Sequence, residues 1–179
     1  HRYSSAASDV YKRQNQDMDD DISKKGFQLY LKSLDPSKMY FYQSDIDEFG
    51  ASADELDDLA KSGDLSFAFA VFNRFLKRIE ERLVVINQLI ESEHDFTLDE
   101  VMMTDSDELE FAKNPAELKD RWRKRIKYSM LVEKSEETAN EDAKNKLHRR
   151  YTSFAKRMNQ FDAEEVTELF LTSLTTAYD

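Results

Sequence analysis

The chain is poor in glycine and proline, the residues that tight turns and loops most often require. Its 179 residues include no cysteine, three glycines and two prolines, whereas average usage at this length would be about a dozen glycines and about nine prolines. The absence of cysteine excludes disulfides, thiolate zinc sites and cysteine nucleophiles. The shortage of glycine and proline argues against β-sandwiches, barrels and glycine-loop nucleotide folds, which need many special turns. The composition therefore favours long helices with few connections.

Two further absences limit the possible partners. No apolar run approaches the roughly 18–20 residues that span a bilayer, so we expect no membrane insertion. The formal net charge is −11, which opposes attraction to nucleic acid because phosphate binding needs local positive charge. The one basic run, Lys119 to Lys127, contains a tryptophan that could stack on a base. Trp122 falls on the apolar stripe of Leu118 and Ile126, however, so we interpret the run as a solvated basic face beside acidic neighbours and predict no nucleic-acid partner.

The first fourteen residues differ from the rest. They lack helical periodicity and the ordered regions of a signal peptide, and the string from Ser4 to Gln14 reads like an in-frame translation of a transposase-based sequencing adapter. A disordered polar tail would explain the composition but not the string. We therefore expect residues 1–14 to be a non-native tail and residues 15–179 to be a single helical domain. This domain holds 23 basic and 36 acidic residues, a net charge of −13.

Apolar periodicity and capping signals predict an all-α bundle of about five or six helices, mainly antiparallel. Proline after Asp35 ends the first helix, Gly63 suits the left-handed residue after the second, and Asp64 is expected to cap the long third helix, whose apolar residues follow a heptad. Residues 95–114 break the pattern and predict an irregular crossover with at most a short strand or two. The expected helices cover residues 20–34, 45–62 (capped by Ser44), 65–91 and 115–132 (capped by Asn114), then a segment including 147–161 after a break at 133–142, and finally a segment opened by Asp162.

The sequence offers no constellation for catalysis or metal binding. Apart from His1, the only histidines are His94 and His148, which lack the spacing of a zinc motif. The glycines stand alone, so neither a nucleophile elbow nor a phosphate loop exists. Glutamate pairs at helical spacing are better explained as solvated carboxylates. We predict no catalytic, cofactor-binding or metal-ligating residue, and no cofactor.

The aromatic segment Met39 to Tyr42 admits two interpretations. It either packs the first connection onto the bundle or forms an exposed patch for a partner. The first is favoured, since aromatic side chains carry large burial energies.

Several segments, taken in order, resemble the helical N-terminal domain of tail-specific, or carboxy-terminal processing, serine proteases. The resemblance covers residues 20–179. It depends on the order and spacing of these segments, and no single segment is diagnostic. The segments are Leu34 to Phe49, Ser62 to Leu65, Asp95-Phe96, Asn114 to Leu118 with Trp122 and Lys127, Arg149 to Tyr151, and Ala163 to Asp179.

The resemblance implies a peptidase whose PDZ domain and serine/lysine-dyad core would follow Asp179, so it transfers no catalytic residue onto this chain. It also implies a periplasmic location, protein substrates and, in some members, docking of an adaptor lipoprotein. The function expected is a non-catalytic domain that positions the PDZ and protease modules. The alternative from the residues alone is a free-standing acidic helical module that binds a basic protein through its acidic face and aromatic segment.

Overall fold

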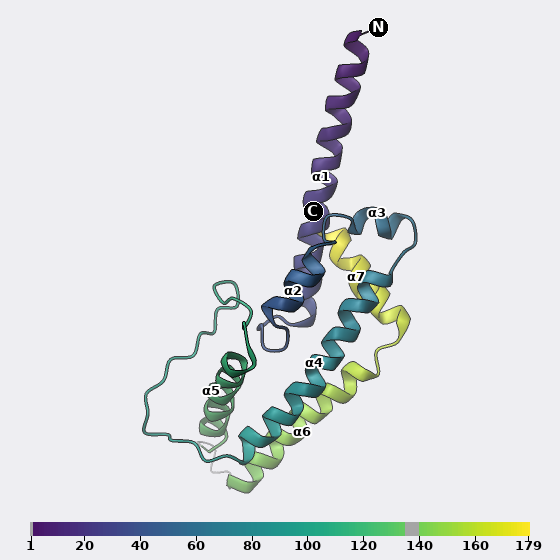
Figure 1. Ribbon diagram of the computed structural model, residues 1–179. Helices are drawn as coiled ribbons and strands as arrows, with labels where there is room; N and C mark the ends of the chain where they lie inside the picture. Colours follow the sequence, from purple (N-terminus) through teal and green to yellow (C-terminus); the bar gives the residue numbers. More distant parts are fainter. Residues whose placement is uncertain (1, 135–139) are drawn as a thin grey trace.

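The computed structural model describes residues 2–134 and 140–179, and within them the fold is all-α, as predicted. Figure 1 shows α4 and α6 lying side by side, with the irregular crossover looping outward between α4 and α5. The described part contains seven helices rather than five or six. They are α1 (Arg2–Leu34), α2 (Gln43–Gly50), α3 (Leu56–Lys61), α4 (Ser66–Glu91), α5 (Pro115–Lys134), α6 (Asn140–Asn159) and α7 (Ala163–Ala177).

The core consists of two apolar clusters that share α4. The first brings together α1, α7 and the N-terminal two-thirds of α4, where Phe72, Phe75 and Ile79 are buried. The second joins the C-terminal end of α4, including Ile86 and Ile90, to α5 and α6. The predicted apolar stripe of α4 is therefore confirmed, and the helix contacts neighbours on more than one side.

The buried half of α1 packs along α7. Gly26 allows the two helices to approach closely, because a Cβ atom at this position would lie 2.6 Å from Leu174 Cδ2. One turn further on, Tyr30 is fully buried, packs edge-on against Phe170, and donates a hydrogen bond to the Ala68 carbonyl at 2.8 Å. The first and last helices of the chain thus form one continuous contact.

The predicted start of the first helix near residue 20 is wrong, since α1 begins at Arg2. Residues 2–19 contain neither glycine nor proline, so nothing interrupts a helix once its buried half has formed and each further residue adds one backbone hydrogen bond. Figure 1 shows this part projecting away from the other helices. Its side chains Val10 and Tyr11 are largely exposed. The adapter origin of residues 1–14 stays a prediction.

The predicted single helix over residues 45–62 is also wrong. Two short helices, α2 and α3, replace it, and the first begins two residues earlier, with Tyr42 rather than Ser44 at the N-cap. Gly50 and the following serine and aspartate are poor helix formers, and the break allows α3 to reach α1, where Ser23 Oγ accepts a hydrogen bond from the Asp57 N–H. Gly63 adopts the expected left-handed conformation, with φ of 80°.

The remaining boundaries agree more closely with the prediction. The Glu117 N–H donates to Asn114 Oδ1 at 2.9 Å, so α5 starts as expected and ends at Lys134. Asp162 caps α7 in a reciprocal capping box with Glu165. The crossover over 95–114 is irregular, and its one bridge within the described chain pairs Tyr42 with Ala112. The predicted break at 133–142 includes residues 135–139, which lie outside the described residues. Helix α6 begins at Asn140 and ends at Asn159, so it is shorter at its end than the predicted segment, which included Phe161. The long helix α4 starts at Ser66, whose N–H donates to Asp64 Oδ1.

Candidate functional site

The aromatic segment Met39 to Tyr42 lies at the centre of the molecule. Phe41 is fully buried, and Met39 and Tyr42 are nearly so. Tyr40 is half-buried, and its ring lies 5.6 Å from that of Phe75 and 5.5 Å from that of Trp122. The segment therefore joins the two core clusters, and the interpretation that it packs the first connection onto the bundle is confirmed.

A buried carboxylate shapes the loop that delivers these aromatic residues. Asp35, only 2% exposed, accepts hydrogen bonds from the backbone N–H groups of Met39, Tyr40 and Phe41 at 2.9–3.0 Å. Burial raises the pKa of Asp35, and the three N–H donors oppose that rise because they stabilise the ionised form. Trp122 Nε1 completes the arrangement by donating to the Met39 carbonyl at 2.7 Å. Sequence reasoning used Asp35 only as the end of a helix and missed this role.

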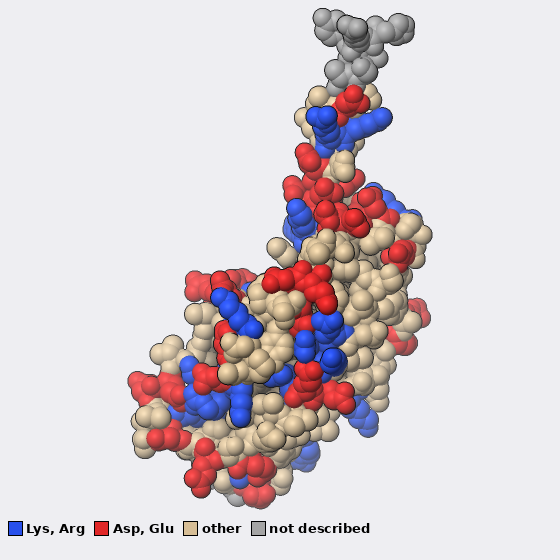
Figure 2. Space-filling model, in the orientation of Figure 1, with Lys and Arg blue, Asp and Glu red and all other residues tan. Residues whose placement is uncertain are grey.

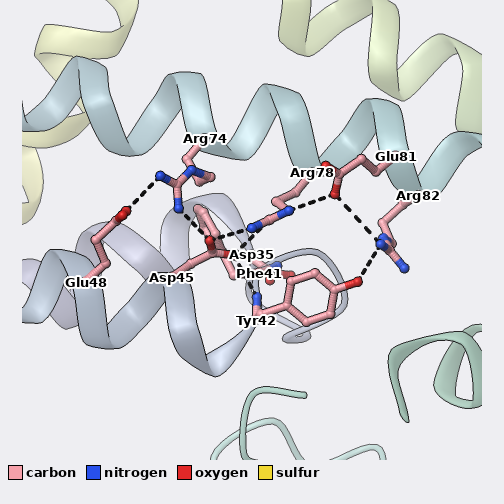
Figure 3. Close-up of polar contacts among 9 residues, drawn as sticks. All are labelled: Asp35, Phe41, Tyr42, Asp45, Glu48, Arg74, Arg78, Glu81 and Arg82. Atoms are coloured by element: carbon pink, nitrogen blue, oxygen red, sulfur yellow. Dashed lines mark hydrogen bonds and ion pairs between the residues drawn. The ribbon is translucent and has the colours of Figure 1, made fainter. Parts of the chain in front are cut away.

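A second buried carboxylate ties α2 to α4 (Figure 3). Asp45 receives a hydrogen bond from Arg74 Nη1 at 2.7 Å and two from Arg78, at 2.8 and 2.9 Å. Its other partner is the Tyr42 N–H at 2.9 Å, which is also the capping contact of α2. Burial by itself would raise the pKa of Asp45, but the hydrogen bonds from Arg78, Tyr42 and Arg74 outweigh it, and the net pKa is lowered.

The same network continues along α4. Arg78 Nη1 also contacts Glu81 at 2.8 Å, Arg74 contacts Glu48 at 2.7 Å, and Arg82 donates to the Tyr42 hydroxyl at 2.6 Å. This network was not predicted, although three arginines spaced by four residues lie along one face of the amphipathic helix α4 and were a detectable signal. The contacts drawn in Figure 3 hold the loop and α2 against α4, and the Nε of Arg82 is the one buried polar side-chain atom among them that lacks a hydrogen-bond partner within the described residues, so we interpret the network as structural.

The basic run of α5 fastens the crossover. Arg123 and Lys127 both contact Glu100 at 2.6 Å, and Lys127 Nζ donates to the Leu98 carbonyl. These two cations lower the pKa of Glu100 to about 2. The expected pairing of the basic run with acidic neighbours and the burial of Trp122 are confirmed. The prediction that the whole run is solvated is wrong for Lys127, which is buried because its side chain reaches under the crossover.

The two histidines outside the N-terminal tail have structural partners. His94 Nε2 lies 2.8 Å from the Leu89 carbonyl oxygen, and His148 contacts Asn87 and Glu91. Within residues 2–134 and 140–179, no group of three or more histidine, aspartate or glutamate side chains is arranged to hold a metal ion. Nor does any described helix have the length and apolar character needed to cross a membrane.

The end of α7 is fixed to α3. The Tyr178 hydroxyl donates to Asp57 Oδ1 at 2.6 Å, and Lys61 contacts the other oxygen of the same carboxylate at 2.7 Å. Because the Asp57 N–H is in turn held by Ser23 of α1, three helices meet at this point. We call Ser23, Asp57, Lys61 and Tyr178 the terminal latch.

The fold is an all-α domain whose segments are held together by buried polar networks. The family model described as "Tail specific protease N-terminal domain" matches residues 9–179. The chain belongs to this family, so the resemblance drawn from its sequence segments is confirmed.

One curated relative is the tail-specific protease of Haemophilus influenzae. It is 29% identical over 163 residues, which make up 90% of this chain and 24% of that protein. The chain thus spans about a quarter of the length of this relative. The family match begins at residue 9, inside the segment interpreted as an adapter tail.

Proposed function

We propose that this domain is the non-catalytic N-terminal part of a tail-specific serine protease that acts on proteins from their C-termini. The domain holds PDZ and protease modules in a fixed arrangement and offers a surface to protein substrates or to an adaptor lipoprotein, in the bacterial periplasm. The observation that carries the proposal is the family match over residues 9–179.

The contacts at the end of α7 support a positional role. The terminal latch joins the end of α7 to α1 and α3, so a module attached after Tyr178 would be oriented by three helices rather than by a flexible linker. A role in positioning needs rigidity of this kind, because small displacements of reacting groups reduce catalysis strongly.

The first test is the genomic sequence in frame beyond Asp179. A PDZ domain and a serine/lysine core there are the expected result, and their absence would end the proposal. The second test uses the full-length protein with Tyr178→Phe, which removes the hydroxyl of the latch.

We expect Tyr178→Phe to lower kcat/KM for a protein substrate, while the free energy of unfolding of the helical domain changes little. Tyr128→Phe is the matched control, because this tyrosine is exposed on α5 and far from the latch in sequence. Equal activity of both variants and the wild type would refute the positional role of the latch. Fractionation of cells that express the full-length protein tests the periplasmic location.

A further inference from the structure

A groove on the surface combines an apolar floor with a basic rim. Its volume is about 450 Å³, within the range of ligand-binding clefts. It lies among the end of α1, the loop that follows, α5, α6 and the start of α7. The floor consists of six large apolar side chains, all half-buried: Tyr40, Tyr151, Phe154, Met158, Phe161 and Leu169.

Three arginines line this floor: Arg125, Arg150 and Arg157. Arg125 lies over the Trp122 ring at 5.7 Å and Arg157 over the Phe154 ring at 5.8 Å. Neither has a carboxylate within ion-pair distance in the described part of the chain, whereas Arg150 contacts Glu133 at 3.2 Å.

One carboxylate lines the groove from inside. Asp35 is buried, and its oxygens already accept three backbone N–H groups. Its charge offsets part of the field of Arg125. On the outer rim Arg157 is exposed and has no carboxylate within ion-pair distance among the described residues, whereas exposed Arg150 shares its charge with Glu133.

The basic character of this groove contrasts with the acidic charge of the chain as a whole. The chain has a net charge of −11, and Figure 2 shows carboxylates spread over the visible face, with basic side chains mostly intermingled with them. Elsewhere on α4 and α5, carboxylates lie 2.6–3.0 Å from four arginines, Arg74, Arg78, Arg121 and Arg123. Arginine and aromatic side chains contribute much of the binding energy at protein interfaces. In this groove guanidinium groups stack on aromatic rings beside an open apolar floor.

We propose that this groove binds an acidic peptide segment of a partner protein, with apolar side chains seated on the floor and carboxylates paired with Arg125 and Arg157. Charge complementarity selects this occupant. A nucleic acid is disfavoured because its regularly spaced phosphates would extend beyond the three arginines over the acidic remainder of the surface, whereas a short acidic segment contacts the groove alone. The proposal deepens the proposed function by naming the chemistry of the contacted partner, and rests on that function only for identifying the partner as a substrate or an adaptor.

The test measures binding to this chain alone by fluorescence anisotropy. The probe is a short fluorescein-labelled peptide of alternating glutamate and leucine. Two control peptides replace glutamate by lysine, or leucine by serine. We expect saturable binding of the first peptide, much weaker binding of both controls, and weakening of the affinity by added salt, because exposed charge pairs are screened.

Variants locate the site. Arg125→Gln and Arg157→Gln are each expected to weaken binding by about two- to fivefold, the effect of removing an exposed charge pair. Arg149→Gln is the matched control on α6, because Arg149 is exposed and does not line the groove; its affinity should equal that of the wild type. Circular dichroism of each variant verifies that the helical signal is retained.

Several results would overturn the proposal. These are no binding of the acidic peptide, equal binding of the lysine peptide, or equal loss of affinity in Arg149→Gln and Arg157→Gln. Tighter binding of a single-stranded oligonucleotide would assign the groove to nucleic acid. Self-association that is abolished by Arg157→Gln would assign it to a second copy of the chain. Because the assay needs neither a PDZ domain nor proteolysis, its failure leaves the proposed function standing, and the absence of those modules leaves the binding result standing.

Discussion

Gly26→Ala tests whether close approach of α1 and α7 is limited by the missing side chain. The added Cβ would lie 2.6 Å from Leu174 Cδ2, whereas ordinary contacts begin at 3.4 Å, so one of the two helices or the leucine must move by about 0.8 Å. Leu174 is 5% exposed and has little free space. Overpacking of this kind costs about 1–3 kcal/mol.

A gain in helix propensity opposes this cost in stability. Alanine is a better helix former than glycine by about 1 kcal/mol in a helix interior. The net effect of Gly26→Ala is therefore a loss of about 1 kcal/mol in the free energy of unfolding, which lowers Tm by about 2–4 °C for a domain of this size. Urea unfolding and thermal unfolding, both followed by circular dichroism, measure it.

Gly50→Ala is the matched control. A Cβ at this exposed position meets only Phe27 Cε1, at 3.9 Å, which is an ordinary contact. The φ angle of Gly50 is not in the left-handed region, so the substitution should raise stability by about 0.5 kcal/mol through helix propensity alone. If Gly26→Ala stabilises the protein as much as Gly50→Ala does, the close approach is not limiting.

A double-mutant cycle attributes the loss to one contact. Leu174→Val shortens the side chain that the new methyl group would meet. We expect Leu174→Val to be less costly in the Gly26→Ala background than in the wild type, with a coupling of about 0.5 kcal/mol or more. Additive effects would place the strain elsewhere.

Three further predictions follow from the polar contacts and the projecting helix. Asp45→Ala leaves the guanidinium of Arg78 partly buried without its main partner and should cost about 3–5 kcal/mol in urea unfolding; Glu48→Ala, at an exposed carboxylate of the same network, should cost no more than about 1 kcal/mol, and similar losses in the two would contradict the assignment. Because the pKa of Glu100 is lowered from 4.5 to about 2, its contribution to stability is present in full above pH 4.5 and is lost as the pH falls towards 2; the difference in urea midpoint between the wild type and Glu100→Gln should shrink over that interval, and a constant difference would refute the low pKa. Deletion of residues 1–14 should leave Tm unchanged within error, because the described side chains of this segment are exposed; a clear decrease would mean that the segment contributes to the fold.

Much of the fold was predictable because helix periodicity and capping are local. The stripe of α4, the cap at Asn114 and the capping box at Asp162 all depend on residues within a few positions of one another. The break between α2 and α3 was only partly predictable in this way. Gly50 and the serine and aspartate that follow it are weak helix formers, but the hydrogen bond that holds α3 against α1 joins the Asp57 N–H to Ser23, 34 positions away.

The polar interior was the hardest part to predict. Asp35 and Asp45 look like ordinary turn and helix-start residues in the sequence, and only the folded chain encloses them. The arginine-lined groove likewise assembles side chains from residues 33 to 169. Arg125 was interpreted as part of the solvated basic run from Lys119 to Lys127, because the face that it shares with Arg150 and Arg157 appears only when α5 and α6 pack together.

The pairing of α1 with α7 has a consequence for synthesis of the protein. The apolar face of α1 around Phe27 and Tyr30 leaves the ribosome before the other helices of this domain, yet the helix that covers it ends at Ala177. Until α7 has emerged, therefore, this face is covered incompletely and is open to chaperones or to other nascent chains. Completion of the domain requires nearly all of its residues to have emerged, so a ribosome stalled before α7 would hold a chain with an exposed apolar surface.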